Sequence, residues 1–290
     1  MHTITLEKGL ATFLNALSGK NRSAATIRAY QTDISQFISF LHANNVSIQT
    51  PADVEKVDIV EYLSALAKRE LTGIARARKM SAIREYFRFL EGIGVITKSP
   101  TTGIETPKRE KHSRQYLRSD EYTKMLSLAG ANPRDYAVLQ VFLQTGIRVS
   151  ELASLSITDI DFITPSITVR GKGSVQREIA LEKKGIHALK SYLALRPQSI
   201  STRVFLNYQG APISERGIRK LVVKYRTEAG ITKKASCHTL RHTFATYKAE
   251  KGVSPFQLQQ WLGHANLNTT QIYVHLGKQN AKKLMQDTTL

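Results

Sequence analysis

Two imidazoles, a guanidinium and a phenol lie close together near the C-terminal end of the sequence. His238 and Arg241 are three residues apart, so on a helix they would point to the same side. A Gly-His pair ends a second amphipathic segment at His264, and Asn268 is placed to cap a short helix that carries Tyr273. Guanidinium and imidazole groups bind phosphate, and a phenol oxygen can attack it. The set predicts chemistry at a phosphodiester.

Two arginines would be needed to assist such a reaction. A phenol has an ordinary pKa of about 10, so Tyr273 is a weak nucleophile at neutral pH without help. Attack adds negative charge to the non-bridging oxygens, which the permanently charged Arg148 and Arg241 could stabilise with paired N–H donors. Glu151, one helical turn after Arg148, could orient that guanidinium. Since arginines would supply the positive charge, we expect a site that needs no metal and no cofactor.

Proton transfer also has candidates. Lys172 occupies a Gly-Lys-Gly hairpin tip, from which its ammonium could protonate the leaving 5′-oxygen. His238 and His264 could donate to the phosphate or carry the tyrosine proton. Each of these side chains taken singly is more often a cap, a solvated charge or a packing residue, and their joint appearance is what favours catalysis.

Rival chemistries fit the same residues less well. His238 and His242 have the spacing of a zinc-binding pair, but Thr239 stands where the hydrolytic glutamate of that motif would be. His242 is therefore expected to be a packing residue. A carboxylate-based nuclease is disfavoured because the acidic residues near the predicted strands lack a metal-site spacing. Tyr247 is a second tyrosine in the His-Arg helix, and its context lacks the Leu-Gly-His lead-in that precedes Tyr273.

The charge of the chain predicts a polyanionic partner. The 290 residues carry a net charge of +19, which implies nucleic acid most simply, although charge does not separate DNA from RNA or an anionic membrane. Residues 106–290 hold 29 Lys and Arg against 13 acids, whereas residues 1–105 hold 13 against 10. No segment has the length of a membrane span, no secretory signal is evident, and the single Cys237 fits a reducing compartment. We expect a cytoplasmic, nucleoid-associated protein with no membrane partner.

The first 107 residues read as a helical domain. Helices are predicted at about 6–17, from a Ser23 cap to about Leu41, at about 57–68 after a Thr50-Pro51 start signal, and at about 74–90. The last of these carries three arginines on one side of its apolar stripe, and we expect them to contact phosphates: Arg78, Arg84 and Arg88. A basic, proline-flanked linker follows at 108–118, and four of its cations are further candidates for DNA contact: Lys108, Arg109, Lys111 and Arg114.

Residues 119–290 read as a mixed domain. A helix capped by Ser119 runs to about 129, and others are expected at about 133–144 and 148–155. A hairpin with strands at 167–170 and 177–181 comes next. Further helices are predicted at about 184–195, 214–229, 239–250, 255–262 and 269–275, before a basic tail at 278–290 that looks detachable.

Four motifs resemble those of the tyrosine recombinase family. They read TGIRVSEL (145–152), GKG (171–173), HTLRHTFAT (238–246) and LGHANLNTTQIYVH (262–275). The set is specific because its members appear in order with suitable gaps, and the compact length resembles Xer-type members and transposon resolvases. The resemblance implies a mainly α fold, in which an N-terminal helical core-binding domain and an α+β catalytic domain with a small antiparallel sheet form a C-shaped clamp on DNA.

The resemblance also implies roles and partners. Arg148 and Arg241 would clamp the phosphate with Glu151 as the accompanying acid, Lys172 would be the general acid, and His238 and His264 the two histidines. Tyr273 would be the nucleophile that forms a 3′-phosphotyrosyl link. Partners would be double-stranded DNA with specific core sites and three further copies of the chain on DNA. The tail would dock on a neighbouring copy, and a second recombinase or accessory protein could take part.

Two alternatives to a recombinase stay open from sequence. One is a relaxing, topoisomerase-like activity without synapsis, and the other is a non-catalytic, sequence-specific DNA-binding protein on the same fold. The complete residue set argues against the second. Chromosome resolution, transposon resolution and element integration are not distinguished by the sequence.

Overall fold

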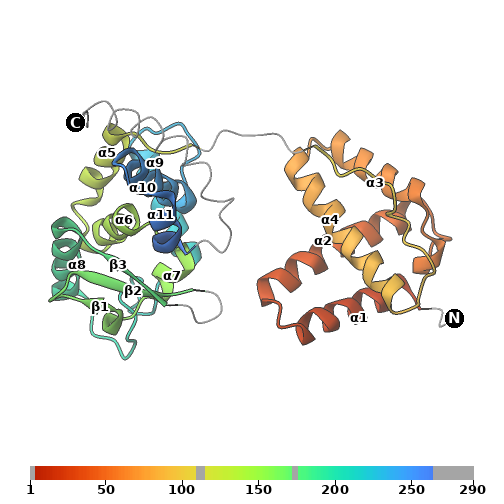
Figure 1. Cartoon of the computed structure of the whole chain (residues 1–290), viewed down its shortest axis with the longest axis horizontal. Helices are drawn as coiled ribbons and strands as arrows, with labels where there is room; N and C mark the ends of the chain where they lie inside the picture. The colour runs from red at the N-terminus through yellow and green to blue at the C-terminus, as the bar shows by residue number, and fades with distance from the viewer. Residues whose placement is uncertain (1–3, 109–114, 172–175, 264–290) are drawn as a thin grey trace, which may run out of the picture. The chain divides into compact units, whose positions relative to one another are not determined.

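The chain folds as two compact units, Met1–His112 and Ser113–Leu290, each with a hydrophobic core of its own (Figure 1). The computed structural model describes residues 4–108, 115–171 and 176–263. Helices predominate in both units, and the described strands form one small sheet in the second unit.

The first unit contains the four predicted helices. Their bounds are α1 (Leu6–Gly19), α2 (Ala24–Asn44), α3 (Lys56–Lys68) and α4 (Gly73–Gly92). The Ser23 cap of α2 is confirmed, because its hydroxyl accepts the N–H of Thr26 at 3.2 Å. The Thr50-Pro51 signal starts a short 3-10 turn, η1 (Pro51–Asp53), instead of α3. The Asp53 carboxylate accepts the Thr50 N–H at 2.7 Å and closes this turn before α3 begins.

Aromatic rings and one close helix approach hold the first unit together. Phe37 and Phe87 are fully buried between the helices, and the Tyr86 hydroxyl donates to the Leu6 carbonyl at 2.9 Å. A Cβ on Gly9 would lie 2.7 Å from that hydroxyl, so the glycine allows α1 to pack against α4. The core therefore fixes α4, which carries the predicted DNA-binding arginines.

The second unit is a helical layer around one central helix, with a small sheet at one side (Figure 1). Its helices are α5 (Ser119–Ala129), α6 (Pro133–Thr145), α7 (Val149–Ser154), η2 (Ile157–Asp159), α8 (Lys183–Leu195), α9 (Glu215–Glu228), α10 (Cys237–Glu250) and α11 (Pro255–Leu262). The antiparallel sheet has the order β1-β2-β3, with β1 (Ile160–Asp161), β2 (Ser166–Arg170) and β3 (Gln176–Ala180). Ile167 lies opposite Ile179, and Val169 lies opposite Arg177.

The central helix, α6, fixes the chain that leads to Arg148. Residues 137–142 are all buried, because α5, α8, α9 and α10 pack around α6. Asn132 caps its start, and Gly146 ends it with a left-handed φ of +60°. A Cβ on Gly146 would lie 2.4 Å from a ring carbon of Phe244, so both the backbone angle and the contact require glycine.

The predicted elements of the second unit are confirmed within the described residues, with two corrections. Arg118, not Ser119, caps α5, because the Arg118 N–H is bonded to the Glu121 carboxylate at 2.7 Å. The short strand β1 was not predicted. The expected helix at 269–275 and the tail at 278–290 lie outside the described residues. Within the described ranges, no helix has the length and apolar character needed to span a membrane.

We expect Gly146→Ala to lower the free energy of unfolding by about 3 kcal/mol, from backbone strain and the Phe244 overlap together. Gly210→Ala is the matched control, since Gly210 also has a positive φ, +77°, but a Cβ there meets no atom within 4 Å. Strain from φ should cost that variant about 1 kcal/mol. Chemical denaturation of the two variants measures the difference. Equal losses would mean that the Phe244 contact has no role.

Candidate active site

Arg148 sits where α6 ends and α7 begins. Gly146 turns the chain, Ile147 is fully buried beneath it, and Arg148 takes the N-cap position of α7. The Arg148 N–H donates to the Glu151 carboxylate at 2.7 Å, and its Nη1 donates to the same carboxylate at 2.9 Å. The TGIRVSEL motif therefore builds a helix end, a tight turn and a helix start that together hold one guanidinium. The Arg148 side chain is 40 % exposed.

Arg241 comes from α10 and reaches the same place. Arg241 is buried, and its Nη1 donates to the Gly146 carbonyl at 2.7 Å. Its Nη2 donates to the Leu262 carbonyl at the end of α11, also at 2.7 Å. One guanidinium thus ties the turn before Arg148 to α11, and Figure 1 shows α7, α10 and α11 gathered on one side of the unit.

The C-terminal end of α11 is bound by three arginines. Consecutive carbonyls accept from different side chains: Trp261 from Arg177 Nε at 2.6 Å, Leu262 from Arg241 at 2.7 Å, and Gly263 from Arg148 Nη2 at 2.6 Å. We call these three side chains the arginine clasp. The last carbonyls of a helix lack partners within the helix and carry partial negative charge, so cationic donors satisfy both needs. Gly263 ends α11 in a left-handed conformation, at φ +62°.

Glu151 is the charged centre beneath the clasp. The residue is buried, and its carboxylate accepts from Arg177 Nη1 at 2.9 Å and Nη2 at 2.8 Å, in addition to the two bonds from Arg148. Burial raises the pKa of Glu151, but the hydrogen bonds and charges of Arg177 and Arg148 outweigh this and leave the pKa below its usual value of 4.5. Glu151 is therefore ionised at neutral pH.

The structure brings some predicted site residues together and leaves others outside its description. Arg148, Glu151 and Arg241 meet at the end of α11. His238 is exposed on α10, one turn before Arg241. The remaining three predicted residues lie outside the described ranges: Lys172, His264 and Tyr273.

Arg177 was missed by the sequence reasoning although a signal existed. Strand residues two apart share a face, and Ile179 is buried on β3. Arg177 therefore had to point toward the core, where a charged side chain requires acceptors.

Two residues considered as alternatives have other environments. His242 is buried and packs edge-on against Tyr116, with ring centroids 6.3 Å apart. Tyr247 packs edge-on against Tyr122 of α5, with centroids 5.5 Å apart, and burial raises its pKa. A phenol with a raised pKa ionises less readily, so these surroundings do not favour Tyr247 as a nucleophile.

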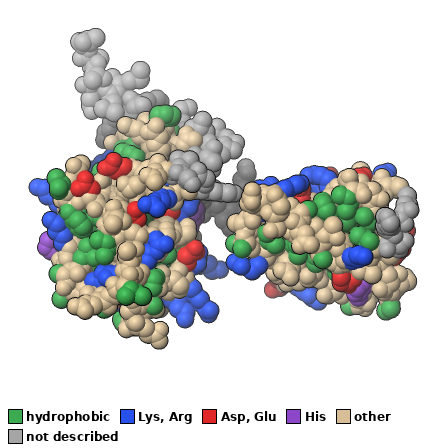
Figure 2. Space-filling model, turned by 90° about the horizontal axis from the view of Figure 1, so that it is seen from below, with side chains coloured by type: hydrophobic (Ala, Val, Ile, Leu, Met, Phe, Trp, Pro, Cys, Tyr) green, Lys and Arg blue, Asp and Glu red, His purple; other side chains and the backbone are tan. Residues whose placement is uncertain are grey.

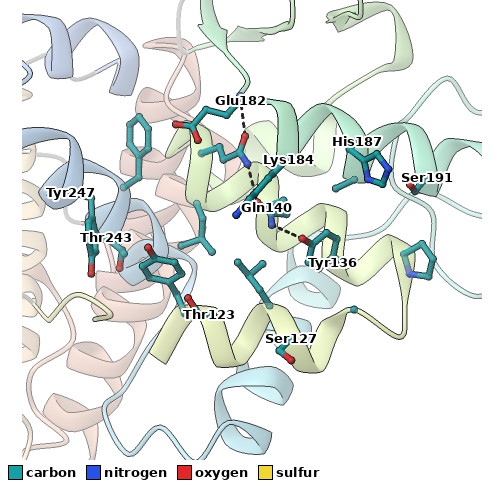
Figure 3. Close-up of a pocket in the computed structure, with 18 of the residues that line it drawn as sticks. Thr123, Ser127, Tyr136, Gln140, Glu182, Lys184, His187, Ser191, Thr243 and Tyr247 are labelled. Atoms are coloured by element: carbon teal, nitrogen blue, oxygen red, sulfur yellow. Dashed lines mark hydrogen bonds between the residues drawn. The ribbon is translucent and has the colours of Figure 1, made fainter. Parts of the chain in front are cut away.

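Tyr247 lies on the wall of a groove between α5, α6, α8 and α10 (Figure 3). The groove has a volume of about 910 Å³, and a chain of hydrogen bonds runs along it from the Glu182 N–H through Gln144 and Gln140 to Tyr136. Arg148 and Arg241 are absent from its lining. The groove is therefore separate from the arginine clasp.

The predicted DNA-binding cations differ in their surroundings. Arg78 pairs with the buried Asp33, and Arg84 donates to the Ile104 carbonyl at 2.9 Å. Arg88 is 65 % exposed and pairs with Glu85 on its own helix. Lys108 is exposed, whereas the other linker cations lie outside the described residues: Arg109, Lys111 and Arg114. Lys and Arg side chains are prominent on the visible face of each unit in Figure 2.

The depressed pKa of Glu151 predicts a pH-dependent contribution to stability. Glu151→Gln removes the charge that two guanidiniums share and should lower the free energy of unfolding by about 3 kcal/mol at pH 7. A carboxyl whose pKa is depressed in the folded state stabilises above its unfolded pKa and loses that effect as pH falls through the folded value. The gap between wild type and Glu151→Gln, measured by chemical denaturation, should therefore be constant above about pH 5 and shrink below it. A gap that stays constant into the acid range would contradict the assignment.

Comparison with known proteins finds relatives that match both units of the chain. The chain matches the Phage integrase family over residues 115–280 and the Phage integrase, N-terminal SAM-like domain over residues 10–92. It is 34% identical over 280 residues to Tyrosine recombinase XerC of Thermodesulfovibrio yellowstonii, covering 92% of this chain and 91% of that protein. It is 33% identical over 292 residues to Tyrosine recombinase XerD of Listeria innocua, covering 97% and 94%.

A solved structure shares the fold. A lambda integrase tetramer bound to a Holliday junction superposes with a TM-score of 0.78 at 19% identity, covering 94% of this chain and 78% of that one. The helical first unit, the three-stranded sheet of the second and the matches along the chain lead to one conclusion: this protein belongs to the phage integrase family and is an Xer-like site-specific tyrosine recombinase.

Proposed function

We propose that the protein cleaves and rejoins DNA strands through a 3′-phosphotyrosyl link to Tyr273. The observation that carries the proposal is the convergence of Arg148 and Arg241 on the C-terminal end of α11. The next residue in the chain is His264, and Tyr273 follows nine residues later. A phosphate held by the two guanidiniums would therefore be bound beside the segment that supplies His264 and Tyr273.

The proposed reaction is a phosphoryl transfer from DNA to Tyr273. The Tyr273 oxygen attacks the scissile phosphorus and loses its proton, while the bond to the 5′-oxygen breaks. Lys172 gives a proton to that leaving oxygen, and His238 and His264 bind the phosphate or carry the tyrosine proton. In rejoining, a 5′-hydroxyl attacks the phosphotyrosine and Tyr273 leaves.

The described arginines are suited to stabilising this transition state. The two bonds of Arg148 to Glu151 and Gly263 use two of its five N–H donors, and the side chain is partly exposed. Two guanidiniums pair with the one carboxylate of Glu151, and Arg241 donates to the Gly146 carbonyl nearby, so the site keeps an excess of positive charge for a phosphate. Donors fixed before the substrate binds stabilise developing charge without further reorganisation.

We further infer that copies of the chain assemble on paired core sites and exchange strands through a Holliday junction. The lambda integrase tetramer bound to such a junction supports this assembly. The tail at 278–290 would dock on a neighbouring copy. Exposed Arg88 and Lys108 are the strongest described candidates for phosphate contacts away from the scissile bond.

Tyr273→Phe should abolish covalent attachment to DNA and leave DNA binding intact, because the change removes the attacking oxygen alone. The substrate is a nicked duplex whose core site is selected from a randomised pool by binding to the protein. Incubation in EDTA is followed by denaturing electrophoresis, and Tyr247→Phe is the matched control that should retain the band.

Two outcomes would overturn the assignment. A covalent band that persists in Tyr273→Phe would show that another residue is the nucleophile. A wild-type protein that binds its selected site and forms no band would favour the non-catalytic DNA-binding alternative.

Binding to the core site should weaken steeply with salt, because basic side chains that contact phosphates release counterions from DNA. For six to ten phosphate contacts, affinity should fall by about 10³ to 10⁵ between 50 and 200 mM salt. Fluorescence anisotropy with a labelled core-site duplex measures this slope. A flat response would contradict a phosphate-dominated interface.

A further inference from the structure

Arg177 is a largely buried arginine at the site, and the proposed reaction assigns no step to it. Its side chain is 11 % exposed and leaves β3 toward the core of the second unit. Nη1 and Nη2 donate to the two oxygens of Glu151 at 2.9 and 2.8 Å, and Nε donates to the Trp261 carbonyl at 2.6 Å. All three nitrogens of its guanidinium therefore have protein acceptors.

The guanidinium of Arg177 also lies against the end of α11. A Cβ on Gly263 would lie 2.9 Å from Arg177 Nη1 and 3.2 Å from its Cζ. Gly263 is therefore the residue that lets the guanidinium plane and the helix end approach each other. This contact fixes the backbone from which the chain continues to His264.

Arg177 and Arg148 share one carboxylate but differ in exposure. Arg148 is 40 % exposed, while Arg177 and Glu151 are almost completely buried. If Arg148 were the only partner of Glu151, the carboxylate would neutralise the charge of Arg148. Both carboxylate oxygens would then be free to accept hydrogen bonds from the two terminal nitrogens of Arg148. With Arg177 occupying both carboxylate oxygens, the three groups carry a net charge of +1, and Arg148 keeps its charge for an external anion.

We propose that Arg177 is a positioning residue for DNA cleavage. It neutralises Glu151 and braces the end of α11, so that Arg148 remains both oriented and available to the scissile phosphate. The proposal rests on the function proposed above. The competing explanation is that Arg177 has a structural role alone and only holds β3 to the core. It predicts that removing Arg177 lowers stability without a specific loss of positive charge at the phosphate.

Arg177→Met tests the proposal on the nicked core-site substrate. The rate of covalent complex formation should fall about 100-fold, because Glu151 would then neutralise Arg148. Losing one preorganised donor to the transition state has an effect of this size. The dissociation constant for the core site should change by less than about threefold, because that constant reflects many phosphate contacts. Thermal unfolding confirms that the variant is folded at the assay temperature.

A matched control separates positioning from a structural role alone. Arg196 also donates from a partly buried guanidinium to four backbone carbonyls: Val204 at 3.1 Å, Ser201 at 2.7 Å, Arg203 at 2.7 Å and Pro197 at 3.4 Å. These bonds lie in the loop after α8, apart from the clasp. Arg196→Met should lower the unfolding temperature while leaving the cleavage rate within about threefold of wild type, since it removes structural bonds alone.

The double variant Arg177→Met/Glu151→Gln gives the sharpest readout. Removing the Glu151 charge restores the net charge of +1, so the double variant should cleave at least about tenfold faster than Arg177→Met alone. A double variant that cleaves no faster than the single one would overturn the charge argument. If Arg177→Met does not fold, the double variant can be used in its place, because it buries no unpaired carboxylate. Its cleavage rate is then compared with that of Glu151→Gln.

A neutral scissile group provides an independent check. With a methylphosphonate in place of the scissile phosphate, the charge of Arg148 matters less, so the ratio of wild-type to Arg177→Met rates should shrink by about tenfold. An unchanged ratio would show that Arg177 has a structural role alone.

The cleavage rates on the ordinary phosphodiester substrate separate the two proposals. If wild type forms no covalent complex with that substrate, the proposed function fails. If wild type and Arg177→Met cleave equally, the proposal for Arg177 fails and the proposed function stands.

Discussion

The short helix α11 depends on cations supplied by other elements. It has eight residues, so its unpaired terminal carbonyls are a large fraction of its backbone. Arg148, Arg177 and Arg241 come from the α6–α7 turn, β3 and α10, and each donates to one of three consecutive carbonyls. A helix that could not be stable by itself is thereby fixed to three separate parts of the unit.

This constraint links stability to chemistry. The same guanidiniums that satisfy a helix end are the groups best suited to a phosphate, because their rigid forks offer several donors at once. Glu151 keeps Arg148 and Arg177 close together by placing one buried carboxylate between them. The arrangement is therefore sensitive to substitution, because a change in one arginine alters the helix end, the carboxylate and the neighbouring arginine together.

Much of this arrangement could be predicted from the sequence, for reasons visible in particular residues. The apolar stripe of α2, the Ser23 cap and Gly146 are local signals, and local signals decide helices. Motif spacing singled out Arg148, Glu151 and Arg241 as candidates, and the structure places them close together. Arg177 was missed because its importance comes from contacts with residues 26 and 84 positions away in the chain. β1 was missed because two residues show no alternation, and the Thr50-Pro51 signal began a turn because Asp53 completed it locally.

The most direct test is a high-resolution structure of the protein held on a nicked core-site duplex by Tyr273→Phe. The account predicts that Arg148 and Arg241 both donate to non-bridging oxygens of the scissile phosphate. It also predicts that Arg177 keeps its fork on Glu151 and its bond to Trp261. A phosphate bound away from both arginines, or a complex in which Arg177 leaves Glu151 to contact the DNA itself, would contradict the account.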